Sequence, residues 1–344
     1  MFKLLNLTFL LGLAFYETNA QIMNASSSVT EWQQVSDGPW SKREGLMGVA
    51  QNGYLFMSGG RTNHGVGFSD EVWRSSDSGA TWTLANSKTF PSRAYHVHLL
   101  VDDCQYIMGG QTFFSFYNDV WESCDGKGEV WTEVNKAADW DARAGLAATV
   151  TSAGDIVIAG GCYNKNGNPA RRSFYGDVWF SSDKGKTWSL KTKTAEWIAR
   201  SGPRLIEDSS GNLVIIAGEI GFTPETQLVD IWKSADLGVS WELLTDSPGF
   251  SERSGHGVVV TGEGDILVIG GWPHLHDLWL SKDQGATFNQ VSNDVWNCGE
   301  DSCGKFDFWP ILSEDGLNLY TIGGSAAYST FGSLWQDTWV ASLE

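Results

Sequence analysis

Short apolar runs that end at a pair of glycines recur along the whole chain. Residues 54–57, 156–158 and 266–269 are examples, and they consist of aliphatic, β-branched and aromatic residues. Runs of this length, bounded by glycine, predict buried β-strands. The pairs are Gly59–Gly60, Gly109–Gly110, Gly160–Gly161, Gly270–Gly271 and Gly323–Gly324, with Gly218–Glu219 as a degenerate sixth member.

Each glycine pair is followed, after a stretch of variable length, by an acidic residue two positions before a tryptophan. These tryptophans lie 47 to 60 residues apart. A period of about fifty residues with several strands per period predicts a β-propeller rather than an array of helices. The acids and tryptophans are Glu71 and Trp73, Asp119 and Trp121, Asp177 and Trp179, Asp230 and Trp232, Asp277 and Trp279, and Asp337 and Trp339.

A third element, Ser-x-Asp-x-Gly-x-x-Trp, follows these tryptophans and predicts a tight hairpin. An aspartate can tie the backbone of its own turn, and glycine permits a positive φ. The sixth repeat lacks the hairpin because the chain ends at Glu344. The copies begin at Ser75, Ser181, Ser234 and Ser281, the last with Phe288 in place of tryptophan, and a copy one residue longer runs from Ser123 to Trp131.

The strand missing from the sixth repeat is predicted at the other end of the chain. Thr30, Glu31 and Trp32 resemble the strand that carries Trp82. Trp32 precedes Arg43 by eleven residues, and Trp82 precedes Arg93 by the same number. We therefore expect the N-terminal strand to complete the last blade and close the ring, which removes exposed sheet edges.

Together these motifs give the chain a family resemblance. The glycine pairs, the later tryptophans and the Arg-x-Gly-His sequence from Arg253 to His256 resemble kelch repeats, whereas the Ser-x-Asp-x-Gly-x-x-Trp turns resemble the Asp-box (BNR-like) hairpins of sialidases and sortilin-like proteins. The resemblance covers about residues 30–344. It implies an all-β, six-bladed, kelch-like β-propeller with four strands per blade, and it says little about chemistry.

The N-terminus predicts export from the cell. Residues 1–20 combine an early lysine, an apolar stretch and small residues before Ala20, which is the pattern of a signal peptide. Residues 21–29 form a serine-rich lead-in that carries the sequon Asn24-Ala25-Ser26, and residues 30–344 form one propeller domain. A secreted or extracellular glycoprotein is therefore expected, with no membrane insertion because no other segment is long and apolar enough.

Five cysteines are consistent with an oxidising compartment. Cys298 and Cys303 are close enough in sequence to close a small loop. Cys104 and Cys124 lie on predicted strands whose antiparallel pairing would bring them together. Cys162 is then left over, either as a free thiol or as part of a more specific site.

The charge of the chain excludes one class of partner. The 344 residues include 23 basic and 41 acidic side chains, a net charge of −18. Nucleic-acid binding requires a basic surface, so no nucleic-acid partner is expected. Hydrophobic residues make up 42% of the chain, enough for a sizeable core.

Five repeats begin their inner strand after an arginine, and these arginines allow two interpretations. They would either form ion pairs with the acids of the third strands and hold neighbouring blades together, or face the central mouth and bind an anion. In the sixth repeat Phe306 or Asp307 is counted at the arginine position. The arginines are Arg43, Arg93, Arg143, Arg200 and Arg253.

Histidines and aromatic residues, which we expect on the same face of the propeller as these arginines, complete the candidate site. His96 and His256 are binding and catalytic candidates, although their repeat position holds leucine in other blades, which also fits a packed core histidine. Tyr163 and Trp272 are candidates for a ligand wall in the long loops. No cofactor is predicted. If a metal ion binds, His256, His274 and His276 are the side chains it would use.

Asp307 is the most informative candidate, because a carboxylate replaces an arginine of the predicted ring. Nearby arginines would lower its pKa, whereas burial would keep it protonated. The sequence leaves that choice open.

The expected function is recognition of a small anionic molecule, a glycan or an extracellular peptide at the central mouth. The alternative is a secreted enzyme at the same mouth, with His256, His274, His276 or Asp307 as acid–base groups and arginines as anion stabilisers. A matrix or coat protein without a small ligand is a third alternative. Sialidase activity is not expected, because the chain has no Arg-Ile-Pro motif near the first repeat. The oligomeric state is left open.

Overall fold

The computed structural model describes residues 29, 31–62, 67–164, 172–221, 223–297, 304–326 and 333–343. The predicted signal peptide, the sequon at Asn24 and the Cys298–Cys303 pair lie outside these residues. The fold is all-β: the described part of the chain contains antiparallel strands, one 3-10 turn at Pro224–Thr226 and no α-helix. No helix among these residues has the length and apolar composition needed to cross a membrane.

Six antiparallel sheets of the described chain have four strands each. The first three are β3 (Met47–Gln51), β4 (Tyr54–Ser58), β7 (Val72–Ser75) and β8 (Thr83–Asn86); β9 (Val97–Val101), β10 (Cys104–Met108), β11 (Val120–Ser123) and β12 (Thr132–Asn135); and β13 (Ala147–Val150), β14 (Ile156–Ala159), β17 (Val178–Ser181) and β18 (Ser189–Thr192). The others are β19 (Arg204–Glu207), β20 (Leu213–Glu219), β21 (Gln227–Ser234) and β22 (Glu242–Thr245); β23 (Gly257–Val260), β24 (Ile266–Gly271), β25 (Leu275–Ser281) and β26 (Asn289–Ser292); and β28 (Trp309–Leu312), β29 (Asn318–Ile322), β32 (Asp337–Ser342) and β1 (Gln33–Asp37).

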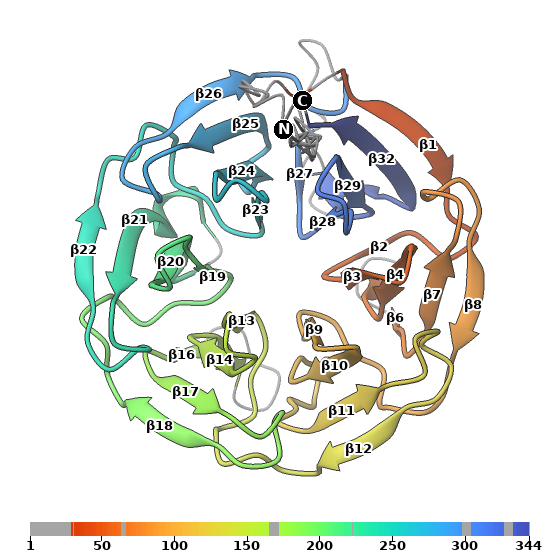
Figure 1. Ribbon diagram of the computed structural model, residues 1–344, viewed down its shortest axis with the longest axis horizontal. Helices are drawn as coiled ribbons and strands as arrows, with labels where there is room; N and C mark the ends of the chain where they lie inside the picture. The colour runs from red at the N-terminus through yellow and green to blue at the C-terminus, as the bar shows by residue number, and fades with distance from the viewer. Residues whose placement is uncertain are drawn as a thin grey trace, which may run out of the picture.

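Figure 1 shows these sheets arranged around a common centre, with β3, β9, β13, β19, β23 and β28 as the innermost strands. Each innermost strand contacts the innermost strand of the next sheet, and β28 contacts β3 in the same way. Smaller pairings lie near the centre: β2 (Arg43–Glu44), β5 (Arg61–Thr62) and β6 (Gly67–Phe68); β15 (Cys162–Asn164) and β16 (Arg172–Phe174); and β27 (Lys305–Phe306), β30 (Ser325–Ala326) and β31 (Ser333–Leu334).

The two ends of the described chain meet in one sheet. β1 pairs antiparallel with β32, with Gln33 opposite Val340 and Asp37 opposite Asp337. The strand begins at Gln33 rather than at the expected Thr30. Trp32, immediately before it, is buried and packs against Trp296, with ring centroids 6.4 Å apart. This packing fixes the entry of the N-terminal strand, because a large aromatic side chain gains most from burial.

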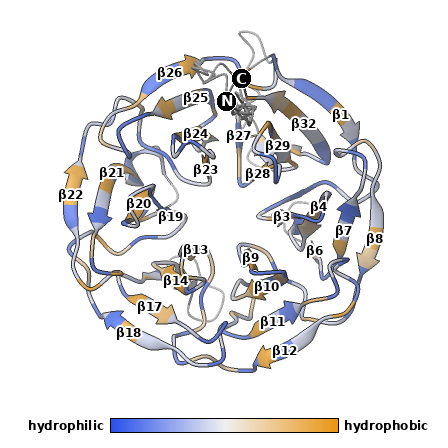
Figure 2. Cartoon of the chain, viewed as in Figure 1, coloured by the Kyte–Doolittle hydropathy of each residue, from blue (hydrophilic) through white to orange (hydrophobic). Residues whose placement is uncertain are grey.

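The hydrophobic core lies between neighbouring sheets. Figure 2 shows hydrophobic positions on the strands around the ring, and one core cluster joins Tyr106 and Met108 of β10 to Ile156 and Ile158 of β14. Pairs of tryptophans fill several of these layers edge to face, at centroid distances of 5.0 to 6.0 Å. The tryptophans of the repeat therefore serve mainly as packing residues. These pairs are Trp40–Trp82, Trp140–Trp188 and Trp197–Trp241.

The Ser-x-Asp-x-Gly-x-x-Trp segments form the expected turns. In the first copy, Gly79 N donates to Ser75 Oγ at 2.9 Å and Thr81 N donates to Asp77 Oδ1 at 2.8 Å. Trp82 Nε1 donates to the carbonyl of Gly79 at 3.0 Å. Each residue type has its own role in the turn: the serine and aspartate oxygens accept hydrogen bonds from backbone N–H groups, and the glycine adopts the positive φ that the turn requires.

A repeated unit of arginine, acid and tryptophan, here called the Arg–acid–Trp frame, stabilises five of the six sheets, and the sixth has a variant of it. Arg143 donates to both carboxylate oxygens of Asp177 at 2.6 and 2.9 Å and to the carbonyl of Gly160 at 3.0 Å. Trp179 Nε1 donates to the same carboxylate at 2.8 Å. These groups belong to one sheet, so the ion pair does not join neighbouring sheets. The backbone makes that connection, for example from Gly161 N to the carbonyl of Arg200 at 2.8 Å.

The sixth sheet has a lysine at the arginine position. Lys305 is buried, and its Nζ donates to Asp337 Oδ2 at 2.6 Å. The assignment of Phe306 or Asp307 to this position is therefore wrong. The degenerate glycine pair also lies one residue earlier than the predicted Gly218–Glu219. Ala217 and Gly218, both with positive φ, take the place of the pair, and Glu219 follows them.

The cysteine predictions are confirmed in part. Cys104 at the start of β10 and Cys124 after β11 form a disulfide. Cys162 is a free, buried thiol. The antiparallel pairing of β10 with β11 brings the first two together, as the spacing predicts.

Candidate functional site

The innermost backbone of the ring forms a narrow collar two residues after each frame cation. These six positions all have left-handed φ values between 54° and 65°. Five of the six consecutive pairs are hydrogen-bonded through their backbones, for example from Tyr95 N to the carbonyl of Gly45 at 2.8 Å and from Asp307 N to that of Gly255 at 2.8 Å. The collar residues are Gly45, Tyr95, Gly145, Gly202, Gly255 and Asp307.

Two members of the collar are not glycine. A left-handed conformation costs an L-residue with a side chain about 1–2 kcal/mol, and strained positions of this kind cluster at functional sites. Tyr95 and Asp307 accept this cost, each at φ 54°. They are therefore the two collar positions that place a side chain at the centre of the molecule.

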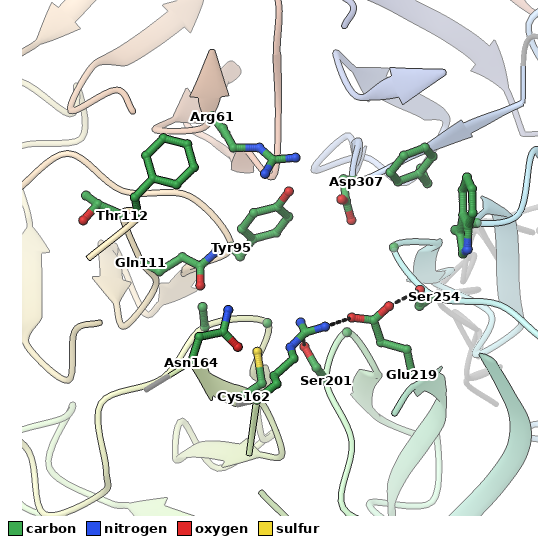
Figure 3. A pocket seen from close by; sticks show the side chains of 18 of the residues that line it. Arg61, Tyr95, Gln111, Thr112, Cys162, Asn164, Ser201, Glu219, Ser254 and Asp307 are labelled. Atoms are coloured by element: carbon green, nitrogen blue, oxygen red, sulfur yellow. Dashed lines mark hydrogen bonds and ion pairs between the residues drawn. The ribbon is translucent and has the colours of Figure 1, made fainter. Parts of the chain in front are cut away.

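A cavity of about 450 Å³ lies above the collar. Figure 3 shows Arg61, Tyr95, Glu219 and Asp307 around this central cavity, together with amide and hydroxyl side chains. Its volume falls within the range of small-molecule sites.

A large part of the cavity wall comes from one short backbone pairing per repeat. In each repeat the residue after the frame cation pairs with the residue after the glycine pair. Nine of these twelve residues line the cavity, whereas Glu44, Ala94 and Ser325 do not. Within a shared backbone, these side chains differ from repeat to repeat. The pairs are Glu44 with Arg61, Ala94 with Gln111, Ala144 with Cys162, Ser201 with Glu219, Ser254 with Trp272, and Phe306 with Ser325.

One polar cluster of the cavity joins Arg61, Glu44 and Tyr95. Arg61 Nε donates to Glu44 Oε1 at 2.6 Å, and Tyr95 Oη donates to the same oxygen at 3.3 Å. The guanidinium lies 5.9 Å from the centre of the Tyr95 ring. About a third of the Arg61 side chain is exposed, whereas Glu44 is buried. Arg61 therefore presents an ion-paired but accessible cation to the cavity.

A second polar cluster lies on the opposite side, around Glu219. Arg172 pairs with Glu219 at 2.8 Å, and Ser254 Oγ donates to the same carboxylate at 3.3 Å. Burial raises the pKa of Glu219, and the charge of Arg172 opposes that shift. Burial also raises the pKa of the Cys162 thiol, so this cysteine is a protonated wall residue rather than a nucleophile.

Asp307 stands between these clusters without a hydrogen bond or ion pair of its own side chain in the described structure. Burial, followed by the negative charges of Glu44 and Glu219, raises the pKa of Asp307 to about 7. Arg61 and Arg204 oppose this shift. The structure thus resolves what the sequence left open: burial outweighs the nearby arginines, and the carboxyl exchanges its proton near neutrality.

Arg204 lies on the other side of the collar. It lines a second cavity of about 30 Å³ together with Asp307, Tyr95 and the collar glycines. Its Nε donates to the carbonyl of His256 at 2.6 Å, and the guanidinium lies 4.8 Å from the centre of the Trp309 ring. Burial lowers the pKa of Arg204 to about 10, so the side chain stays charged at neutral pH.

Aromatic side chains form the upper wall of the cavity. Phe68 and Phe113 meet edge to face at 5.1 Å, and Trp272 and Phe306 do so at 5.3 Å. An apolar wall above convergent charged, amide and hydroxyl groups is suited to a small polar ligand with one flat or apolar side.

The predicted arginines do not line this cavity. All five guanidinium groups are buried and are bound to the acids of the Arg–acid–Trp frame. This placement matches the ion-pair interpretation, except that each pair lies within one sheet. The five are Arg43, Arg93, Arg143, Arg200 and Arg253.

The predicted histidines are also placed outside the central cavity. His96 and His256 are buried behind the collar, and burial lowers the pKa of each well below its usual value. His96 Nε2 lies 2.9 Å from Ser58 Oγ. His274 and His276 are half-buried in the β24–β25 connection and in β25. In the residues that the structure describes, no group of three or more histidine, cysteine, aspartate or glutamate side chains is arranged to hold a metal ion.

Of the remaining candidates, the structure brings Trp272 and Asp307 together in the cavity wall, whereas Tyr163 packs on Phe116 at 4.9 Å. Sequence reasoning missed Arg61, Arg172 and Glu219. A signal for Arg61 was present, because it occupies the variable position that follows a glycine pair in an otherwise regular repeat. Glu219 occupies the same position only after the register is corrected to Ala217 and Gly218.

In comparisons with protein-family models and with curated proteins, the chain matches no family model and no curated sequence. The interpretation of the site therefore depends on its own geometry.

Proposed function

We propose that this chain is a secreted, six-bladed, kelch-like β-propeller with Asp-box hairpins, closed by its N-terminal strand. Six four-stranded sheets around one centre, the contact of β28 with β3, and the pairing of β1 with β32 support this architecture. The disulfide and the N-terminal sequence pattern support secretion.

Its proposed function is recognition of a small anionic molecule, such as an acidic sugar, in the central cavity. The observation that carries this proposal is a difference between two sets of residues: those of the Arg–acid–Trp frame and those that line the cavity wall. The buried Arg–acid–Trp frame is nearly the same in every repeat, whereas the position after the glycine pair carries arginine, glutamine, cysteine, glutamate, tryptophan and serine. A structural role would not require such different side chains at one repeat position, but recognition of an asymmetric ligand would.

A binding assay with matched aromatic variants tests the proposal. Isothermal titration with uronic acids, small hydroxy acids and their neutral counterparts should identify an anionic ligand for the purified protein. Trp272→Ala should weaken its binding about tenfold through loss of the aromatic wall. Phe114→Ala removes an aromatic side chain that is 86% exposed and does not line the cavity, so this variant should bind like wild type. Equal loss in both variants, or no binding by any compound, would reject the proposed site.

Acid–base catalysis in the same cavity is a second candidate function, and the environment of Asp307 favours it. A carboxyl with a pKa of about 7 can donate and accept a proton at neutral pH. Asp307→Asn would then abolish turnover of a bound ligand while its affinity persists. Absence of any chemical change in bound acidic sugars, followed by NMR over hours, would reject this candidate.

A further inference from the structure

We propose that the ligand of the central cavity carries a single negative charge and is bound together with a proton on Asp307. This inference rests on the proposed binding function and specifies its ligand class. It makes Asp307 the residue that couples recognition to pH.

The balance of charge in the cavity and directly across the collar supports a monoanion. Glu44 is neutralised by Arg61 and Glu219 by Arg172. Asp307 and Arg204 remain, and they influence each other across the collar without a direct hydrogen bond. When Asp307 is ionised, these two charges compensate each other. When Asp307 is protonated, the positive charge of Arg204 is left over and attracts one negative charge.

The same geometry opposes an anion beside an ionised Asp307. Asp307 lines both the central cavity and the smaller one, so a carboxylate bound at the collar would lie beside the Asp307 carboxyl. Two carboxylates in such a site repel each other, whereas a protonated carboxyl donates a strong hydrogen bond to a carboxylate. Binding of the anion therefore favours the protonated form.

The groups that face Asp307 determine where this coupling operates. They are Glu44 of β2, Arg61 of β5, Tyr95 of the collar, Glu219 of β20 and Arg204 of β19. Burial raises the pKa of Tyr95 well above its usual value, so it stays neutral at physiological pH. Because the pKa of Asp307 is about 7, the coupling falls near neutrality. A cation is the less suitable ligand, since Glu44 and Glu219 are already ion-paired.

The expected pH dependence follows from the fraction of protein with protonated Asp307. Below about pH 7 this fraction is high and the affinity is constant. Above that pH the apparent affinity for a monoanion should fall about tenfold for each pH unit. Each ligand bound at about pH 8 should take up close to one proton.

The experiment titrates the purified protein with D-glucuronate, D-galacturonate, lactate and acetate from about pH 6 to about pH 9, where all four stay ionised. D-glucose is the neutral match for the uronates. Calorimetry in two buffers with different ionisation enthalpies counts the protons taken up. Asp307→Asn keeps the shape of the carboxyl and should bind the same anion with an affinity that no longer changes with pH. Glu263→Gln makes the same chemical change at an exposed residue and should keep the wild-type profile.

Different failures have different meanings. A wild-type affinity that is independent of pH, or binding without proton uptake, overturns the coupling while the binding function stands. A pH slope that persists in Asp307→Asn assigns the proton to another group and also overturns it. Glucose binding as tightly as glucuronate rejects selection for charge. If none of the anions binds at any pH, the proposed function and the coupling fail together.

Discussion

Replacing Arg143 by alanine should strongly destabilise the fold without testing the ligand site. The guanidinium is buried and donates to the carbonyls of Asp141 and Gly160 and to both oxygens of Asp177. Truncation leaves the Asp177 carboxylate and the Gly160 carbonyl without these donors. Removing one partner of a buried, hydrogen-bonded ion pair costs about 3–5 kcal/mol, and we expect a loss of free energy of unfolding in that range.

Two further variants calibrate this loss. Arg74→Ala breaks an ion pair with Glu129 in which the arginine and glutamate side chains are 22% and 46% exposed, and it should cost less than about 1 kcal/mol. Arg143→Lys reproduces the cation that the sixth sheet uses at Lys305, so it should be less destabilising than alanine. Lysine cannot reproduce the bidentate contact, and a residual loss of about 1–2 kcal/mol is expected.

Urea unfolding followed by tryptophan fluorescence measures these differences, and titration with the anionic ligand follows binding in the variants that fold. Arg143→Lys should bind like wild type, because the guanidinium lies behind the collar. The reasoning is refuted if Arg143→Ala is no less stable than Arg74→Ala. It is also refuted if Arg143→Lys retains full stability but loses the ligand.

Three other predictions concern stability. Replacing Cys104 and Cys124 by serine should lower the free energy of unfolding by about 3 kcal/mol, because the disulfide joins residues 20 positions apart and restricts the unfolded chain. Urea unfolding without reductant should show this difference from the wild type, and the difference should disappear when a reductant opens the wild-type disulfide. Gly202→Ala should lower the free energy of unfolding by about 1 kcal/mol because of its positive φ alone. Gly145→Ala should lower it further, because the added Cβ would lie 2.4 Å from Ser201 Oγ. Equal losses of stability in thermal unfolding would contradict this steric difference. Burial lowers the pKa of His98 to about 4. Its contribution to the free energy of unfolding is therefore present above the unfolded-state pKa of about 6.5 and is lost as the pH falls toward 4. His98→Gln should reduce the dependence of stability on pH between these two values, and an unchanged dependence would contradict this prediction.

The repeat made most of the fold predictable. The glycine-bounded runs at residues 54–57, 156–158 and 266–269 are strands β4, β14 and β24, and the prediction of an all-β fold with four-stranded antiparallel sheets is confirmed. Each signal is local: an apolar run, a glycine at positive φ, or an aspartate that closes its own turn. Local signals survive in the sequence because the same contacts recur in every repeat.

The degenerate repeats were less predictable. Ala217 and Gly218 replace the glycine pair, and Lys305 replaces the frame arginine, so alignment by residue type shifted the register there. Because of that shift, Asp307 was predicted, with Phe306 as the alternative, at the arginine position of the sixth repeat. The residue belongs to the collar and not to the Arg–acid–Trp frame, and its repeat partners are glycines.

Local sequence patterns therefore predict the strands, the turns, the disulfide between Cys104 and Cys124, and an arginine and an acid in most repeats. How these charges are used depends on the tertiary structure. The frame arginines are turned into the sheets, while Arg61, Glu219 and Asp307 meet at the centre from repeats far apart in sequence. Their protonation depends on burial and on charges brought together by the arrangement of the six described sheets, and neither quantity is a property of a local segment.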